Sequence, residues 1–424
     1  MKSKSYEHIG ETVISEKLPN GLTVFVIPKR GFSKKFAMFA TNYGAADRRF
    51  KVGGKWIDTP EGVAHFLEHK MFDMEGYNAL SELTKLGANP NAFTSTEMTA
   101  YYFTCTNAFD ECLKQLLTFV STPYFTEESI AKERGIIGQE IGMTDDEPDY
   151  ALYFNLMKAL YKNHPMRHPV AGSVESIAEI TTQTLYDCHK IFYTPSNMVL
   201  CVAGDVDAES VISAARNILP TDRAEIPSRD YGENEGMTAN EKSVSVKMDV
   251  GMPQFMVGYK CGPGAAGKDF LKYASAADIA LRLMAGRSSK LFTDLYGKGL
   301  INKSFDADFE SVTNQSHAIF AGESKDPDAV IEAIRNAVAD ASRSGFDKKS
   351  FERVKKSLIG SLIRSYSSFE NMCIGACECY FKNCDAFAEY DALLSVTQDD
   401  VMSFIKTRML DCGFAVSTIM PTDI

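Results

Sequence analysis

The fold is decided by a stretch that occurs twice, first as Phe125-Thr-Glu-Glu-Ser129 and again as Phe346-Asp-Lys-Lys-Ser350. Each copy opens a long segment with helical character. A repeat of this kind indicates two similar structural units within one chain. At 424 residues the chain also exceeds one ordinary hydrophobic core, so two or three domains are expected.

The predicted elements follow the same order in both halves of the chain. In the first half, a hairpin signal at Pro19-Asn20-Gly21 joins two strands, and Thr59-Pro60-Glu61 starts a helix with Thr59 as its N-cap. The first-half elements are predicted as strands at Glu11–Leu18, Leu22–Ile27, Lys35–Asn42, Asn91–Thr106 and Asn197–Val202, and as further helices at Asn78–Leu86, Ala108–Ser121, Thr126–Thr144 and Pro148–Lys162. The second half repeats this order with a strand at Gln254–Lys260, a helix at Phe270–Met284, and strands at His317–Ala321 and Gly413–Met420.

The two halves are separated by a polar stretch. Between Leu219 and Ser243 the sequence loses its periodicity and contains several prolines and glycines. We therefore predict an α+β protein with two homologous domains at residues 1–225 and 244–424, joined by a linker at residues 226–243. Each domain is expected to be an antiparallel β-sheet backed by helices.

Composition excludes several classes of function. The net charge of −11 argues against a nucleic-acid partner, because phosphate binding requires a basic surface. The N-terminus has no apolar stretch of the kind found in signal peptides, and no apolar run is long enough to insert into a membrane. These features predict a cytoplasmic location.

The chain contains ten cysteines, which a reducing compartment would keep as buried thiols. The cluster Cys373–Cys384 fits no familiar metal pattern, and Asn371–Phe381 is predicted as a helix lined by small residues. We expect packed core thiols there and assign the cluster no role.

The candidate chemistry lies in the stretch His65-Phe66-Leu67-Glu68-His69. On a helix, residues three and four apart share a face, so both histidines and Glu68 project together. Two imidazoles one turn apart can hold one zinc ion, whose bound water has a pKa of about 7 and can lose a proton to Glu68. A buried helix with these side chains would be costly without a metal.

A catalytic zinc site needs a third protein ligand. Glu133 and Glu140 lie seven residues apart on one predicted helix, so either could ligate the metal while the other orients a histidine. Their second-half equivalents are Val354 and Ser361, and Phe270–Met284 has no histidine pair. The second domain is thus expected to have the fold without the metal site.

These motifs resemble the inverted zincins, the pitrilysin and insulin-degrading family. The stretches Asn91–Ser95, Lys132–Arg134 and Gln139–Ile141 are similar to the substrate strand and third-ligand helix of that family. The length resembles the members related to the mitochondrial processing peptidase, which pair two such subunits into a clamshell. The runs Glu140–Tyr150 and Leu295–Phe305 look most like the bacterial YmfH-type group.

The resemblance implies a zinc endopeptidase that hydrolyses peptides or unfolded segments enclosed in a clamshell dimer, with one Zn²⁺ per chain. It implies that His65, His69 and Glu140 bind the metal, that Glu68 is the general base and that Glu133 supports the site. The substrate would pair with an edge strand formed by residues Asn91, Ala92, Phe93 and Thr94.

One segment departs from the family pattern. Where the family has an arginine and a tyrosine that hold the substrate carbonyl, this sequence has Tyr296 and Asn302. A misaligned register, with Arg287 or Lys290 nearby, is the competing explanation. If the alignment holds, we expect a heterodimer in which a paralogous subunit lacking His-x-x-Glu-His supplies the arginine and the tyrosine. A homodimer is the alternative.

Two other functions compete with a zinc endopeptidase. The chain could be a catalytically silent structural subunit of the same fold in a larger complex, but such subunits are expected to have lost their metal residues. The stretch Gly262–Lys268 nearly spells a phosphate-binding loop, but Asp269 stands where a Ser or Thr hydroxyl should meet magnesium. We therefore read that stretch as a tight turn.

Overall fold

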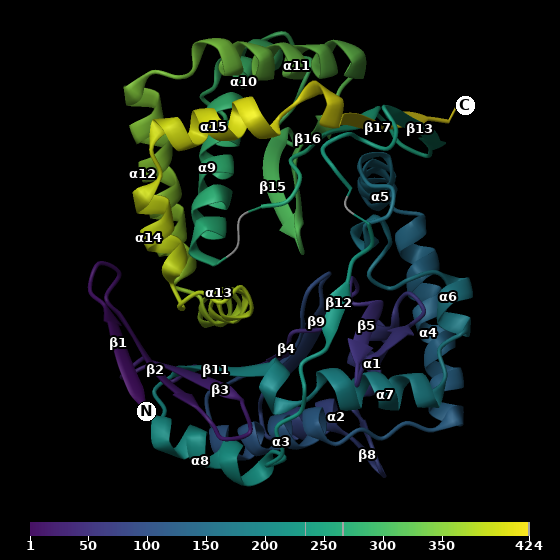
Figure 1. Cartoon of the computed structure of the whole chain (residues 1–424), viewed down its shortest axis with the longest axis vertical. Coiled ribbons are helices and arrows are strands. Elements are labelled where there is room, and N and C mark those ends of the chain that lie inside the picture. Colours follow the sequence, from purple (N-terminus) through teal and green to yellow (C-terminus); the bar gives the residue numbers. More distant parts are fainter. Residues whose placement is uncertain (234, 265–266, 423–424) are drawn as a thin grey trace. The chain divides into compact units, whose positions relative to one another are not determined.

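The computed structural model describes residues 1–233, 235–264 and 267–422. Two residues of the glycine-rich turn, Ala265 and Ala266, lie outside this description. The chain forms two compact units, each combining a sheet with helices, which confirms the α+β fold class (Figure 1). The first unit comprises Met1–Ile141, Pro169–Tyr231 and Ile363–Phe387, and the second comprises Gly142–His168, Gly232–Leu362 and Ala388–Ile424.

The first unit is built on a seven-stranded sheet with the order β1-β2-β3-β11-β4-β10-β9. Its strands are β1 (Lys2–Tyr6), β2 (Glu11–Lys17), β3 (Thr23–Pro28), β4 (Lys35–Thr41), β9 (Asn89–Thr94), β10 (Thr99–Cys105) and β11 (Met198–Gly204), and smaller sheets contain β5 (Arg49–Val52), β6 (Lys55–Asp58), β7 (Asp73–Met74), β8 (Tyr77–Asn78) and β12 (Ser228–Asp230). Its helices are α1 (Val63–Lys70), α2 (Ala79–Lys85), α3 (Phe109–Ser121), α6 (Val174–Ala178), α7 (Thr182–Phe192), α8 (Ala208–Ile218), α13 (Phe369–Phe381) and most of α4 (Glu127–Asp145).

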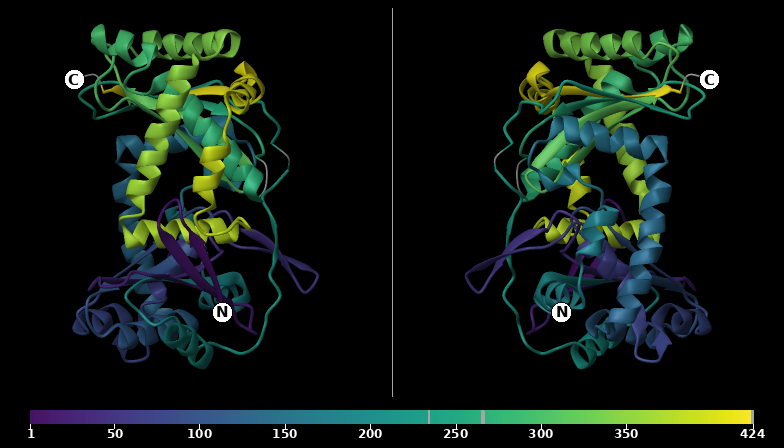
Figure 2. Two further views of the ribbon diagram at one scale, coloured as in Figure 1. Left: turned by 90° about the vertical axis from the view of Figure 1, so that its left-hand side faces the viewer. Right: turned by 90° about the vertical axis from the view of Figure 1, so that its right-hand side faces the viewer.

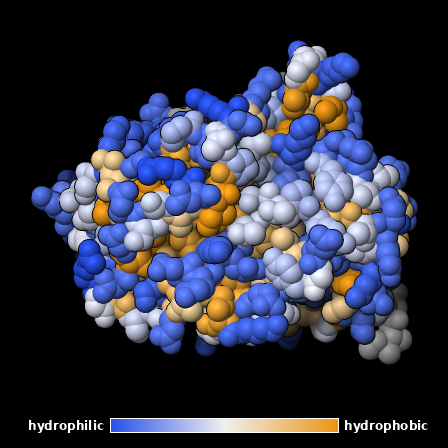
Figure 3. All heavy atoms as spheres, turned by 90° about the horizontal axis from the view of Figure 1, so that it is seen from below, coloured by the Kyte–Doolittle hydropathy of each residue, from blue (hydrophilic) through white to orange (hydrophobic). Residues whose placement is uncertain are grey.

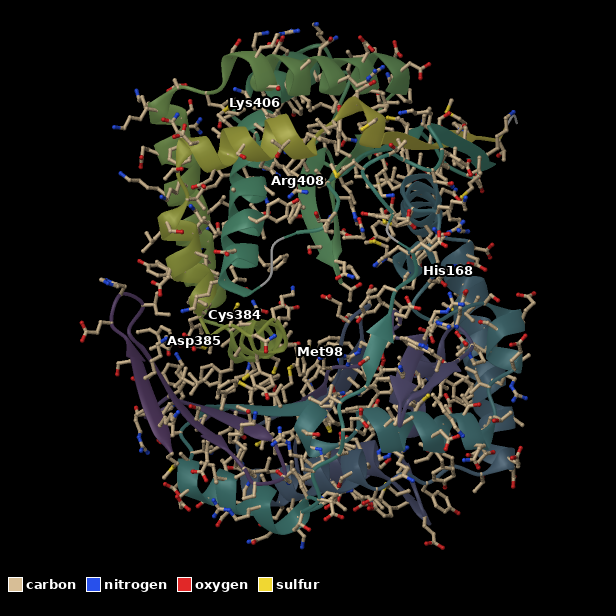
Figure 4. All side chains as sticks on the ribbon, in the orientation of Figure 1. Met98, His168, Cys384, Asp385, Lys406 and Arg408 are labelled. Carbon is tan, nitrogen blue, oxygen red and sulfur yellow. The ribbon has the colours of Figure 1, made fainter. Side chains whose placement is uncertain are left out.

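Helices cover both faces of this sheet. Helix α3 packs on β4 and β10, while α13 packs on β11 and β4 from the opposite face (Figures 1 and 2). This double cover explains why every residue of β11 is buried and why its sequence is an almost continuous apolar run. At the end of α13, Asp385 pairs with Lys4 of β1 at 2.8 Å (Figure 4).

The cysteine cluster lies beneath α13. The thiols of Cys373 and Cys377 are buried beside Cys201 of β11. None of the cysteines in the described residues forms a disulfide, and among them only Cys412 is exposed.

The second unit is built on a five-stranded sheet with the order β13-β17-β14-β16-β15. Its strands are β13 (Ser243–Met248), β14 (Gln254–Lys260), β15 (Asp306–Val312), β16 (Gln315–Glu323) and β17 (Phe414–Pro421). Its helices are α5 (Pro148–Leu160), α9 (Gly267–Ala285), α10 (Lys290–Gly297), α11 (Pro327–Ser344), α14 (Ala388–Ser395), α15 (Gln398–Arg408) and most of α12 (Lys348–Ser365). Helix α5 packs on β17 and β14, while α9 packs on β15 and β16.

The units differ from the predicted domains 1–225 and 244–424 because each sheet is covered by a helix from the other half of the sequence. Helix α5 follows α4 in the chain but packs on the second sheet, and α13 follows α12 but packs on the first. The repeat seen in the sequence therefore extends to an exchange of equivalent helices.

The predicted linker is also partly ordered structure. Within residues 226–243, β12 pairs with β5 in the first unit, and Arg229 Nε lies 2.8 Å from the buried Asp47 carboxylate. The polar composition of this segment indicated a loop, but its charged side chains make specific contacts.

Each main sheet contains one parallel pair, β3 with β11 and β13 with β17, and is otherwise antiparallel. The predicted strand Asn91–Thr106 is two strands, β9 and β10, joined by a turn in which Ser95 Oγ accepts hydrogen bonds from the backbone of Glu97 and Met98 (Figure 4). That turn contains neither Gly nor Pro, the residues that most strongly predict a turn, so it was not predicted.

No helix in the described part of the chain is both long and apolar enough to cross a membrane. Seen from below, apolar residues reach the surface in patches separated by polar side chains (Figure 3).

Candidate metal centre

The helix that carries the two histidines begins later than the sequence predicts. Thr59-Pro60-Glu61 was expected to start it, but α1 begins at Val63 and its N-cap is Gly62, with φ of 87°. A Cβ at Gly62 would lie 2.4 Å from the carbonyl oxygen of Ala171, so both conformation and space require glycine. This close approach fixes the start of the helix against the loop before α6.

Three side chains from α1 and α4 meet in one cluster. Single ligand atoms of His65, His69 and Glu140 all lie within 4.8 Å of one another, and this is the one such group in the described residues. Nε2 of His65 and Nε2 of His69 each lie 3.6 Å from a Glu140 oxygen.

These distances suit a shared metal better than direct hydrogen bonds. A separation of 3.6 Å is too long for a good hydrogen bond. Two ligand atoms about 2.1 Å from one tetrahedral zinc ion stand roughly 3.4 Å apart. The residues present therefore fit a zinc ion held by two imidazoles and one carboxylate.

The sequence left Glu133 and Glu140 as alternative third ligands, and the structure shows that they make different contacts. Oε1 of Glu133 lies 3.0 Å from Nδ1 of His69, on the side of the ring away from Glu140. A carboxylate at Nδ1 favours the tautomer whose proton is on Nδ1, which leaves Nε2 bare for a metal. Glu140 thus faces the Nε2 atoms of both histidines, whereas Glu133 contacts Nδ1 of His69.

The two histidines differ electrostatically. Burial, reinforced by the nearby His69, lowers the pKa of His65 to about 4, so its imidazole is neutral at neutral pH. For His69, burial alone would lower the pKa, but the hydrogen bond to Glu133 and the surrounding carboxylates outweigh it and raise the pKa. Nδ1 of His65 is buried without a hydrogen-bond partner in the described residues, so no hydrogen bond at that atom orients the ring.

Glu68 lies beside the cluster and is oriented by Thr94. The Thr94 hydroxyl donates a hydrogen bond of 2.7 Å to Oε2 of Glu68, while Oε1 has no such partner among the described residues. Burial raises the pKa of Glu68 and the hydrogen bond from Thr94 opposes this, with a raised pKa as the result. A carboxylate in this setting is a stronger base than one in water.

Thr94 ends the strand that was expected to bind substrate. Strand β9 is at the edge of its sheet and pairs with β10, so its other side is a free edge in the described chain. Within it, the Asn91 side chain accepts a hydrogen bond from the Ala92 backbone, and the ring of Phe93 meets Tyr102 edge-on at 6.2 Å. From the sequence, Thr94 was predicted only to contact substrate, and its contact with Glu68 was not predicted.

Sequence reasoning also missed a buried lysine. Lys70 is 1% exposed, contacts Asp73, and lies 3.6 Å from Oε2 of Glu133. The sequence did contain a sign of this lysine's role. Lys70 directly follows the apolar helical turn that carries the metal-binding motif, and a lysine can be buried there only beside a carboxylate.

The other two predicted substrate residues belong to the second compact unit. Tyr296 on α10 is exposed and stacks on Phe292 at 5.6 Å. Asn302 donates a hydrogen bond of 2.7 Å to Glu323. Neither side chain is a cation.

Comparisons with known proteins find similar sequences over most of the chain. The family described as insulinase (peptidase family M16) matches residues 53–174, and the one described as the peptidase M16 inactive domain matches residues 179–358. The zinc protease YmfH of Bacillus subtilis is 38% identical over 99% of both chains, and the zinc protease YmxG of the same organism is 27% identical over 74% of this chain and 79% of its own.

Solved structures show the same likeness. An M16-like peptidase of Alicyclobacillus acidocaldarius is 31% identical, covers 97% of this chain and 99% of its own, and superposes with a TM-score of 0.93. The family model for the inactive domain begins at residue 179, inside the predicted first domain, and also covers residues 244–358 of the domain that was expected to lack a metal site. On this evidence the chain belongs to peptidase family M16, a family of zinc proteases.

Proposed function

We propose that this chain is a zinc metalloendopeptidase that uses Glu68 as its general base and binds one Zn²⁺ through His65, His69 and Glu140. The observation that carries the proposal is the convergence of these three side chains beside Glu68, which lies on the same helix as the two histidines, while Glu140 comes from α4. A catalytically silent subunit would be expected to lack part of this set, and the chain retains all of it.

When bound, zinc would polarise the scissile carbonyl and acidify a water molecule. Thr94 holds Oε2 of Glu68, which leaves Oε1 to take the proton of the attacking water. The raised pKa of Glu68 makes it a better proton acceptor and, once protonated, a donor to the leaving amine. Glu133 keeps the imidazole of His69 in the tautomer that can bind metal.

The substrate is proposed to be an extended peptide that pairs with the free edge of β9 at Asn91, Ala92, Phe93 and Thr94. Addition of a strand supplies backbone hydrogen bonds with little sequence selectivity. Because Thr94 is the last residue of β9 and contacts Glu68, a peptide on this edge would lie beside the base.

The partner is proposed to be a paralogous subunit that lacks His-x-x-Glu-His and brings an arginine and a tyrosine to the substrate carbonyl. The support is that Tyr296 and Asn302 offer no cation, and that Asn302 is already bonded to Glu323. Loss of one donor to a developing oxyanion typically costs about a hundred- to a thousandfold in rate. A homodimer is the competing arrangement.

A cytoplasmic location is also part of the proposal. It is supported by free thiols throughout the described chain, including four within Cys373–Cys384. Oxidising compartments favour disulfides between such neighbours.

The experiment combines metal analysis with peptide hydrolysis. Purified protein should contain about one zinc ion per chain, and a chelator should abolish hydrolysis. Glu68→Gln should retain zinc and lose activity by about a hundred- to ten-thousandfold, whereas Glu140→Ala should lose the metal itself. Hydrolysis by Glu68→Gln at the wild-type rate would disprove its role as base.

The partner proposal needs a separate assay. The chain should be measured alone and after mixing with the candidate paralogue, and again with the paralogue's arginine replaced. Full activity of the isolated chain, unchanged by either addition, would rule out the heterodimer and leave the role of Glu68 untouched.

A further inference from the structure

The second compact unit contains a cavity that the proposed peptidase activity does not use. Residues of α9, α10, α11 and α12 border it, and its volume is about 510 Å³. These four helices are labelled in the upper part of Figure 1. Small-molecule sites in proteins usually measure about 300–1,000 Å³. The cavity is therefore large enough for an organic ligand.

One wall of the cavity is apolar. Ala333, Ala337 and Ala341 border it from α11, each one helical turn from the next, so they form a single face of small side chains. Leu291 and Leu295 of α10 border it as well, and both are buried. The alanines leave the space that larger side chains would fill, and the surrounding surface favours an apolar body.

The charged residues of the border are mostly cationic. This contrasts with the net charge of −11 for the whole chain. The charged residues that border the cavity are four cationic ones, Arg282, Lys290, Lys298 and Arg353, and two acidic ones, Asp294 and Asp340.

Arg353 is held at the border by a hydroxyl group, whereas Lys298 interacts electrostatically with the Asp294 carboxylate. Lys290 pairs with Asp294 at 2.6 Å and Arg282 pairs with Asp306 at 3.4 Å. Arg353 instead donates a hydrogen bond of 2.6 Å to the hydroxyl of Ser288 and has no carboxylate partner in the described residues. Its guanidinium is thus oriented at the border of the cavity while its charge is not neutralised.

We propose that this cavity binds a small organic anion, with its acidic group at Arg353 and its apolar body against the alanine face of α11. The chemical class is a carboxylate, sulfonate or phosphate attached to a hydrocarbon or aromatic body. Such a ligand fulfils both requirements of the site, because it neutralises a cation and covers apolar surface. The proposal goes beyond peptide hydrolysis and does not depend on the metal centre.

The probe for the experiment is 8-anilinonaphthalene-1-sulfonate, whose fluorescence rises when its rings enter an apolar site. It is titrated into the full-length chain, and decanoate and decanol are then compared as competitors. Decanoate should displace the probe at about a threefold lower concentration than decanol, because both share the hydrocarbon chain and only decanoate can pair with Arg353. Binding should weaken as salt is added, because the contact with Arg353 is partly exposed.

Matched variants locate the site. Ala337→Phe fills the hollow and should raise the Kd of the probe about tenfold, whereas Ala339→Phe, on the exposed side of the same helix, should not change it. Arg353→Gln should raise the Kd about threefold, and Lys356→Gln, an exposed charge that does not border the cavity, should have no effect.

Circular dichroism must show that each variant is folded. If Ala337→Phe fails to fold, the exposed pair Arg353→Gln and Lys356→Gln still decides the question. Equal probe affinity in the wild type and Arg353→Gln, or displacement by decanol as effective as by decanoate, would overturn the proposal.

Discussion

Glu133→Gln should weaken zinc binding without removing a ligand. The Glu133 carboxylate accepts a hydrogen bond from Nδ1 of His69 at 3.0 Å and lies 3.6 Å from the ammonium group of Lys70. A glutamine of the same shape can still accept the hydrogen bond through its carbonyl oxygen. It cannot supply negative charge, and its amide hydrogens would face Lys70.

The magnitude follows from that single change. A hydrogen bond to a charged group is worth about 1.5–3 kcal/mol and a neutral one about 0.5–1.5 kcal/mol. The difference, about 1–1.5 kcal/mol, corresponds to about a tenfold loss of zinc affinity, and supporting residues of this kind typically contribute about 10–100-fold. Glu140→Gln removes an anionic ligand and should exceed this range.

The assay is a competition for zinc between the protein and a fluorescent chelator at neutral pH, with circular dichroism as a check on folding. Wild type, Glu133→Gln and Glu140→Gln should rank in that order of affinity. Equal losses in the two variants would show that both glutamates ligate the metal. An unchanged affinity in Glu133→Gln would show that His69 needs no support.

Three further predictions concern the glycines of α1 and α4, the Glu235 carboxylate and the orientation of Glu68. Gly138→Ala on α4 should raise the free energy of unfolding by about 0.5–1 kcal/mol in thermal denaturation, because the added Cβ meets nothing within 4 Å; Gly62→Ala, with its positive φ and close carbonyl, should destabilise the fold by about 1–2 kcal/mol or more. For Glu235, burial would raise the pKa, but backbone N–H groups near the end of α5 and the Lys260 ammonium lower it to about 2. Its contribution to stability is therefore complete above the unfolded pKa of about 4.5 and is lost as the pH falls toward 2, so urea denaturation should show a steeper acid loss for the wild type than for Glu235→Gln. Thr94→Val should lower peptide hydrolysis while zinc content stays unchanged, since only the orientation of Glu68 is lost; Thr94→Ser should keep the wild-type rate.

The sequence predicted those parts of the molecule that depend on local periodicity. The spacing of His65, Glu68 and His69 places them on one helical face whatever the rest of the chain does. The seven-residue spacing of Glu133 and Glu140 likewise put both on one side of α4. Only the distances in the structure distinguish the carboxylate that faces the Nε2 atoms, Glu140, from the one that contacts Nδ1 of His69, Glu133.

Features that depend on packing were predicted less well. Thr59 carried a strong N-cap signal, yet the helix starts after Gly62 because a close backbone contact requires a left-handed residue there. The contact between Thr94 and Glu68 joins a sheet edge to a helix, and no spacing rule relates the two. The sequences of α5 and α13 also contain no pattern that predicts which of the two sheets each helix covers.

The exchange of α5 and α13 has a consequence during synthesis of the chain. Strand β11 is complete at Gly204, but the helix that covers one of its faces ends at Phe381. At about 5–20 residues per second, a ribosome needs roughly 10 to 40 seconds to make the intervening residues. Throughout that interval the nascent metal-binding unit exposes the apolar side of β11 and β4, so we expect the emerging chain to depend on chaperones until α13 has been translated.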